Sequence, residues 1–174
     1  MGDSLSAAFG IERSQGWVNL LQDYLNSKGK HYKVINASVS GETTRGGLTR
    51  LPRTIKKHQP SIVIIALGGN DGLRGLPLNE FRNNLDAMIS LAKSSNAKVV
   101  LNGIRIPPNL GLTYVAEFIH VYTAAAKKHN IPLVQYMLKN VASNASLMQN
   151  DGIHPTAEAQ PIILKNVLSG LEAI

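Results

Sequence analysis

The sequence predicts a three-layer α/β/α sandwich, in which helices cover both faces of a parallel β-sheet. Segments typical of strands alternate with segments typical of helices along the chain, which is the pattern of parallel α/β proteins. The run 62–67 (IVIIAL) is apolar throughout, as expected for a central strand buried on both faces. The chain has 174 residues and contains no repeat, low-complexity segment or linker, so residues 1–174 are expected to form a single domain.

The first helix is expected over residues 16–29. Trp17, Leu21 and Leu25 recur every four positions, which places them on one helical face. A short β-branched segment, residues 32–37, is expected to form the next strand.

A second helix is expected to carry Leu48, Leu51 and Ile55 on its inner face. Pro52 lies within it. Because proline has no N–H to donate to the preceding turn, we expect a kink or a new turn at this position. The buried strand, residues 61–67, follows.

The second half of the chain continues the alternation. The expected elements are a helix over 78–94, a strand over 98–101, a helix over 113–129, a strand over 131–134 and a final helix from 156 to the end. Thr156 is expected to cap the final helix, because its hydroxyl can accept a backbone N–H of the first turn.

Composition excludes several classes of site. The chain has no cysteine, which excludes a thiol nucleophile, disulfides and cysteine-ligated zinc. None of its five histidines has the pairing with glutamate that marks a metalloprotease helix, so we expect no metal site.

The net charge of +7 is compatible with weak association with an anionic membrane surface. Aromatic residues make up 5% of the chain and are not interleaved with a basic run, so we expect no nucleic-acid partner. No signal peptide or transmembrane segment is recognisable in the sequence.

Four polar clusters are candidates for a common site: residues 2–6 (GDSLS), 36–41 (NASVSG), 68–71 (GGND) and 151–155 (DGIHP). All except the first follow a predicted strand. In open parallel sheets, sites form outside the carboxyl ends of the strands. We therefore expect these clusters to meet at one end of the sheet.

Ser4, His154 and Asp151 have the residue types of a nucleophile, its base and an orienting carboxylate. Imidazole titrates near neutral pH and can take the proton of a serine hydroxyl. Asp151 lies three residues before His154, so in a tight turn its carboxylate can reach the same imidazole. The alternative is a helix N-terminus that Asp151 caps, with His154 on the surface.

Asn70, Gly41 and the backbone N–H of Ser4 are candidate donors to an oxyanion. The Asn70 amide can donate directly, and Gly41 has no side chain to keep an oxygen away from its N–H. A strand-to-helix turn without a chemical role is the alternative for residues 68–71. A phosphate-binding loop is disfavoured, since no Gly-Lys-Ser/Thr follows.

Taken together, the four clusters resemble the blocks of the SGNH (GDSL) hydrolase family, in the family's order and along essentially the whole chain. The resemblance is strongest to small bacterial periplasmic enzymes with thioesterase, lysophospholipase and arylesterase activities. The segments 69–75 (GNDGLRG) and 104–107 (IRIP) contribute to it.

The resemblance implies a flavodoxin-like fold and a serine esterase that acts through an acyl-enzyme. It implies lysophospholipid, acyl-CoA or aryl ester substrates, no cofactor, a monomer and a periplasmic location. The substrate contacts are expected at Asp71, Gly72, Arg105 and Pro107, within loops 72–78 and 105–114 that line an acyl groove.

One part of the family pattern is missing. The family has a buried strand directly before the GDSL block, whereas here Met1 alone precedes Gly2. We therefore expect segments 34–37 and 62–67 to lack a neighbouring strand and to leave backbone groups unpaired.

Two other functions fit the same sequence. A carbohydrate acetylesterase is possible because the family also removes acetyl groups from sugars. A non-catalytic, lipid-binding α/β module would result if the missing strand disabled the site.

Overall fold

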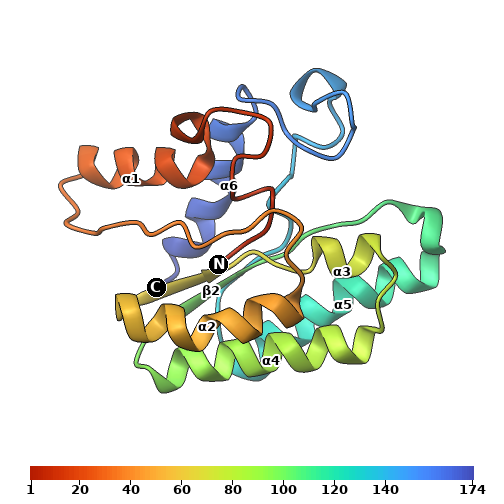
Figure 1. The fold of residues 1–174 in the computed structure, drawn as a ribbon. Coiled ribbons are helices and arrows are strands. Elements are labelled where there is room, and N and C mark those ends of the chain that lie inside the picture. Colours follow the sequence, from red (N-terminus) through yellow and green to blue (C-terminus); the bar gives the residue numbers. More distant parts are fainter.

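The computed structural model describes all 174 residues and has the predicted three-layer architecture (Figure 1). Its sheet contains β1 (Ile62–Ile65), β2 (Lys98–Asn102) and β3 (Leu133–Val134), which are parallel and ordered β1-β2-β3. The α/β/α prediction is confirmed.

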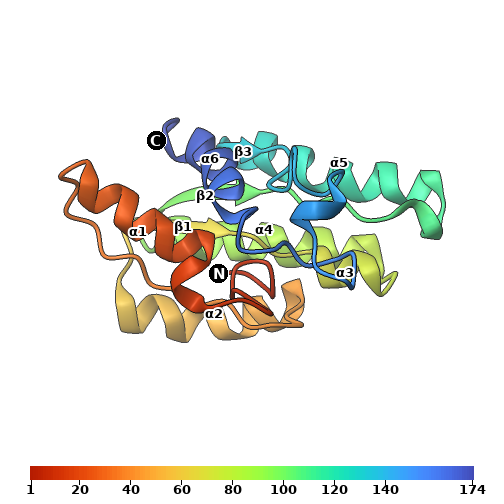
Figure 2. The ribbon, with the colours of Figure 1, turned by 90° about the horizontal axis from the view of Figure 1, so that it is seen from above.

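Helices cover both faces of the sheet, as Figures 1 and 2 show from two directions. One layer holds α2 (Thr44–His58), α4 (Leu78–Ser94) and α5 (Leu112–His129), and the other holds α1 (Trp17–Ser27) and α6 (Gln160–Leu171). The short elements are α3 (Gly69–Leu73) and the 3-10 turns η1 (Arg13–Gln15), η2 (Pro108–Leu110) and η3 (Ala145–Leu147).

Aromatic packing below the sheet supports the loop that follows β1. Phe81 of α4 stacks on Phe118 of α5 with ring centroids 4.9 Å apart, and Tyr122 meets both rings edge-on. The Tyr122 hydroxyl donates to the Leu67 carbonyl at 2.8 Å. Gly68 follows in a left-handed conformation (φ 119°), and a Cβ there would collide with Tyr122 and Phe81. This cluster fixes where the polar segment 68–71 leaves the sheet.

Three predicted elements differ from the structure. Helix α2 continues through Pro52, so no new turn begins there. Helix α6 begins at Gln160 with Ala159 as its N-cap, so Thr156 does not cap it; the Thr156 N–H instead donates to the Leu147 carbonyl. Helix α3 occupies most of the segment expected to be loop after β1.

The strand expected over residues 32–37 does not form. Side chains satisfy its backbone in place of a neighbouring strand. The Gln22 side chain accepts from the Val34 N–H at 2.7 Å and donates to the Tyr32 carbonyl at 2.9 Å, and Arg50 donates to the Ala37 carbonyl. A strand requires a partner ladder, and this segment has none.

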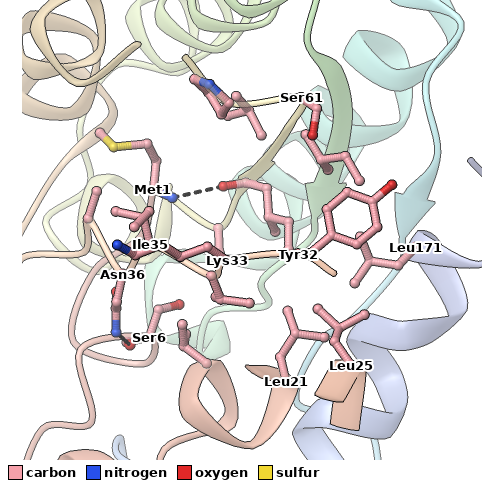
Figure 3. A pocket seen from close by; sticks show the side chains of 18 of the residues that line it. Met1, Ser6, Leu21, Leu25, Tyr32, Lys33, Ile35, Asn36, Ser61 and Leu171 are labelled. Atoms are coloured by element: carbon pink, nitrogen blue, oxygen red, sulfur yellow. Dashed lines mark hydrogen bonds between the residues drawn. The ribbon is translucent and has the colours of Figure 1, made fainter. Parts of the chain in front are cut away.

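An apolar groove of about 780 Å³ lies along the free edge of β1 (Figure 3). At its end, the Met1 amine donates to the Ile64 carbonyl at 2.9 Å and the Ala66 N–H donates to the Met1 carbonyl at 2.8 Å. These bonds and a parallel bridge between Gly2 and Ala66 continue the sheet for two residues. Burial lowers the pKa of the Met1 amine to about 5, and the positive charge of Arg50 adds to the effect.

The groove is separate from the predicted catalytic residues, since Ser4, Asp151 and His154 do not line it. None of the helices combines the length and apolarity required to cross a bilayer.

Candidate active site

The nucleophile candidate lies in a tight turn that follows the Gly2–Ala66 bridge. The Asp3 carbonyl accepts from the N–H groups of Ser6 and Ala7, and the Asp3 side chain accepts from the Leu5 N–H at 3.0 Å. These bonds wrap the chain around Ser4 and leave it half-buried. The turn is bound to segment 36–41 as well, because Asn36 donates to the Ser6 carbonyl at 2.7 Å.

The base candidate lies in the segment before α6. Asp151 Oδ1 accepts from the N–H groups of Ile153 and His154, each at 2.9 Å. This turn places Asp151 Oδ2 at 2.6 Å from His154 Nδ1, and His154 Nε2 lies 2.8 Å from Ser4 Oγ. With the proton on Nδ1, facing the carboxylate, Nε2 is free to accept the serine proton.

The two ends of the chain therefore meet at this site. Figures 1 and 2 show the N-terminal turn and the segment before α6 running side by side, and the Ser4–His154 contact joins them. The turn predicted from the three-residue spacing of Asp151 and His154 is present.

The charge of Asp151 is stabilised by its hydrogen bonds. The backbone N–H of His154, then its imidazole and then the N–H of Ile153 together lower the pKa of Asp151 to about 2. Asp151 is consequently ionised at neutral pH, where it can hold the imidazole and stabilise the imidazolium formed when Ser4 loses its proton.

Asn70 projects from the first turn of α3 toward segment 36–42. Its amide nitrogen donates to the Glu42 carbonyl at 3.1 Å and lies 3.5 Å from Asp3 Oδ2. Gly41 adjoins Glu42 in a left-handed conformation (φ 78°), and Arg74 donates to its carbonyl at 3.0 Å. The structure thus brings Gly41 and Asn70 together.

The N–H groups of Ser4 and Gly41 donate to no atom of the chain. Ser4 is half-buried and Gly41 is exposed, so solvent can reach both residues. An oxyanion site requires donors that the protein has not already used. These two groups are therefore available to an incoming oxygen.

Asp3 is a second carboxylate beside the site. Burial raises its pKa to about 6, an effect that the bond from the Leu5 N–H and the charge of His154 partly oppose. Asp3 holds the turn around Ser4, because its carboxylate and carbonyl accept hydrogen bonds from backbone N–H groups of the turn.

Asp71 and Gly72 do not lie where substrate contacts were expected. Asp71 is buried, and its carboxylate accepts from both the N–H and the hydroxyl of Thr44. Gly72 is also buried, and a Cβ there would collide with Ile106 and Phe118. Both residues hold α3 against its neighbours, because the helix that forms here turns them away from solvent.

Arg105 and Pro107 are exposed, as expected for residues of a substrate rim. The guanidinium of Arg105 lies over the ring of Tyr136 at 4.9 Å. The loops 72–78 and 105–114 touch each other: Tyr114 donates to the Leu76 carbonyl at 2.8 Å, and Leu110 lies against Gly75. The two loops therefore contact each other.

Phe9 and Gln149 also belong to the site, although the sequence did not single them out. The Phe9 ring packs against the imidazole of His154, and Gln149 donates to the carbonyls of Phe9 and Pro155. Side-chain bonds to backbone carbonyls leave no pattern in the sequence. The proximity of Gln149 to the DGIHP cluster was the sole available signal. No group of three or more His, Cys, Asp and Glu side chains is arranged to hold a metal.

Comparison with known proteins identifies the family. The model of the GDSL-like lipase/acylhydrolase family matches residues 1–161. The chain belongs to this family. It is 47% identical to "Esterase TesA" of Pseudomonas aeruginosa over 174 residues, which cover 100% of this chain and 87% of that protein.

Two further relatives agree. "Thioesterase 1/protease 1/lysophospholipase L1" of Escherichia coli K12 is 42% identical over 94% of this chain and 77% of its own length. A crystal structure of esterase EstA from Pseudoalteromonas sp., inhibited by monoethylphosphonate, superposes with a TM-score of 0.95 at 39% identity. The superposition covers 99% of this chain and 94% of the EstA chain. The chain is an SGNH-type esterase, a hydrolase of ester and thioester bonds.

Proposed function

We propose that Ser4, His154 and Asp151 are the catalytic triad and that Ser4, Gly41 and Asn70 form the oxyanion hole. The observation that carries this proposal is the unbroken series of contacts from Ser4 Oγ through His154 to Asp151. The unpaired N–H groups of Ser4 and Gly41 supply two oxyanion donors. The Asn70 amide, which donates to the Glu42 carbonyl and lies 3.5 Å from Asp3 Oδ2, supplies the third when it turns from one of these oxygens toward the oxyanion.

The reaction has two steps. Ser4 Oγ attacks the acyl carbonyl while His154 Nε2 takes its proton, and the oxygen that gains negative charge receives hydrogen bonds from the oxyanion hole. His154 then protonates the leaving alcohol or thiol, and the acyl group remains on Ser4. In the second step His154 removes a proton from water, which attacks the acyl-enzyme and releases the carboxylic acid and free Ser4.

We propose acyl esters and thioesters of apolar acids as substrates, namely lysophospholipids, acyl-CoA and aryl esters. The name of the E. coli relative supports thioesters and lysophospholipids, and that of the P. aeruginosa relative supports esters in general. The rim formed by loops 72–78 and 105–114 carries the exposed apolar side chains of Leu73, Leu110 and Leu112, which suit an acyl chain.

A series of p-nitrophenyl esters of increasing acyl length separates this proposal from a carbohydrate acetylesterase. We expect hydrolysis to extend to medium and long chains. Activity confined to the acetyl ester would instead favour the acetylesterase.

Covalent labelling tests the nucleophile. A fluorophosphonate should modify the folded wild-type chain once, at Ser4, and should leave Ser4→Ala unmodified. Peptide mapping locates the adduct. Equal labelling of the wild type and Ser4→Ala would eliminate Ser4, and no labelling of folded wild type would favour the non-catalytic lipid-binding module.

We further propose a monomeric, periplasmic enzyme that associates weakly with anionic membranes. The net charge of +7 supports the membrane association. Sedimentation velocity, cell fractionation and co-sedimentation with anionic and neutral vesicles test the three statements. Binding to anionic vesicles should weaken as salt is added.

A further inference from the structure

The ring of Phe9 covers the imidazole of His154. The two ring centroids are 4.4 Å apart with the planes inclined by 37°, and Phe9 remains 48% exposed. Phe9 therefore contacts the imidazole while about half of its surface stays open to solvent. The reaction steps given above assign Phe9 no role.

Several contacts fix Phe9 in this position. Its N–H donates to the Ser4 carbonyl at 3.2 Å, and its carbonyl accepts from Gln149 Nε2 at 2.8 Å. The same nitrogen donates to the Pro155 carbonyl at 2.9 Å. Gly10, next in the chain, is left-handed (φ 74°) and leaves no room for a Cβ against the Gln149 amide. Gln149 thus joins the turn of the nucleophile to the segment of the base.

The proton transfer in the first step places the leaving group near Phe9. His154 Nε2 must lie within hydrogen-bonding reach of the leaving oxygen, since it gives that oxygen a proton. A ring that packs directly on this imidazole lies against the group attached to that oxygen. Flat aromatic groups stack on such a ring, whereas branched alkyl groups gain less from it.

We propose that Phe9 contacts the leaving group and favours aryl esters, and that Gln149 is a positioning residue that holds Phe9 over His154. This inference rests on the proposed function, because it assumes that His154 protonates the leaving group.

Two esters of the same acid test the inference in the full chain: phenyl butyrate and hexafluoroisopropyl butyrate. Their alcohols have similar acidity, so the esters differ mainly in the flat ring. We expect Phe9→Leu, which keeps the apolar bulk, to lower kcat/KM for the phenyl ester about two- to tenfold more than for the fluoroalkyl ester. Phe9→Tyr should retain the preference of the wild type.

Gln149→Leu removes both amide donors at nearly constant size. We expect it to reduce the phenyl preference in the same direction as Phe9→Leu. Phosphonate titration counts the competent sites and thermal melting reports folding, so a loss of folded protein is separated from a change of preference. Because a merely structural role would lower both rates together, the ratio of the two kcat/KM values is the decisive readout.

An equal fall for both esters in Phe9→Leu, or no fall, would overturn the inference. If Phe9→Leu does not fold, Phe9→Tyr and Phe9→Trp replace it: retention of the phenyl preference in both supports the inference, and its loss in both overturns it. If the wild type hydrolysed neither ester, the result would count against the proposed function itself.

Discussion

The carboxyl end of the sheet and the free edge of β1 differ in the kind of contact that organises them: hydrogen-bonded side chains at the carboxyl end and apolar side chains along the edge. At the carboxyl end, Asp151 uses both carboxylate oxygens and His154 uses both ring nitrogens. Along the edge of β1, the sheet continues for two residues beside Ala66 and then gives way to an apolar groove.

This contrast shows that turns and loops, more than strand ladders, fix the geometry of the site. Ser4 is held by the bonds that Asp3 makes to the residues after it, and His154 by the bonds of Asp151. Four predictions test how independent the site and the edge are, from the largest expected effect to the smallest.

Removal of the base should have the largest effect. His154→Ala is expected to lower kcat about 10⁴-fold or more, because Ser4 then has no proton acceptor. His120→Ala is the matched control, since His120 is exposed on α5 and its hydrogen bonds are to Thr123 of the same helix. Steady-state hydrolysis of a p-nitrophenyl ester measures both. A comparable loss in His120→Ala would show that the effect is not specific to the site.

Removal of Asn70, the proposed side-chain oxyanion donor, should have the second-largest effect. Asn70→Ala is expected to lower kcat by about 10²–10³ with little change in KM, since the donor acts on the transition state. Asn166→Ala is its control: Asn166 also donates its amide to backbone carbonyls, those of Met137 and Lys139. A rise in KM at constant kcat would instead indicate a role in ground-state binding.

The cost of truncating a core leucine should differ between the two sides of the sheet. Leu85 of α4 is fully buried in close packing, whereas Leu21 of α1 is buried but borders the groove. We expect Leu85→Ala to lower the free energy of unfolding by about 3–4 kcal/mol and Leu21→Ala by about 2 kcal/mol. Urea denaturation measures both, and equal costs would mean that the groove side is packed as well as the other.

The smallest effect is expected from the Met1 amine. Its pKa falls from 8.0 to about 5 in the folded chain, so the folded state binds fewer protons than the unfolded state between these values. The stability contributed by the neutral amine is fully present above pH 8 and is lost as the pH falls from 8 toward 5.

Acetylation of the Met1 amine should remove this dependence. Melting temperatures of the free and acetylated chains are compared from about pH 6 to 8. Because both chains contain the same histidines, the difference between the two curves reports the Met1 amine alone. Parallel curves for the free and acetylated chains would contradict the burial of the amine.

Asp3 acts in the opposite sense at lower pH. Because burial raises its pKa, the stability contributed by its protonated form is lost as the pH rises from about 4 to 6.

The layers of the fold and the residues that meet at the candidate site were predictable from the sequence for a physical reason. The strand 62–67 and the face of the helix 78–94 carry periodicities that burial imposes, and a nucleophile, base and carboxylate require particular residue types. The spacing of Asp151 and His154 within one turn made their contact foreseeable as well.

The remaining features depend on neighbours that are distant in sequence. Residues 32–37 have the composition of a strand, but a strand forms only beside another. Asp71 was expected to contact substrate, but its position in α3 directs its carboxylate to Thr44. Gln149 donates to carbonyl groups, which every residue possesses, so its contacts emerge from the fold alone.

The contact between Ser4 and His154 spans 150 positions of the chain. No short stretch of the sequence contains both residues, so the contact exists only while the intervening sheet and helices are folded. Loss of the fold therefore separates the serine from the histidine even though both side chains remain chemically intact.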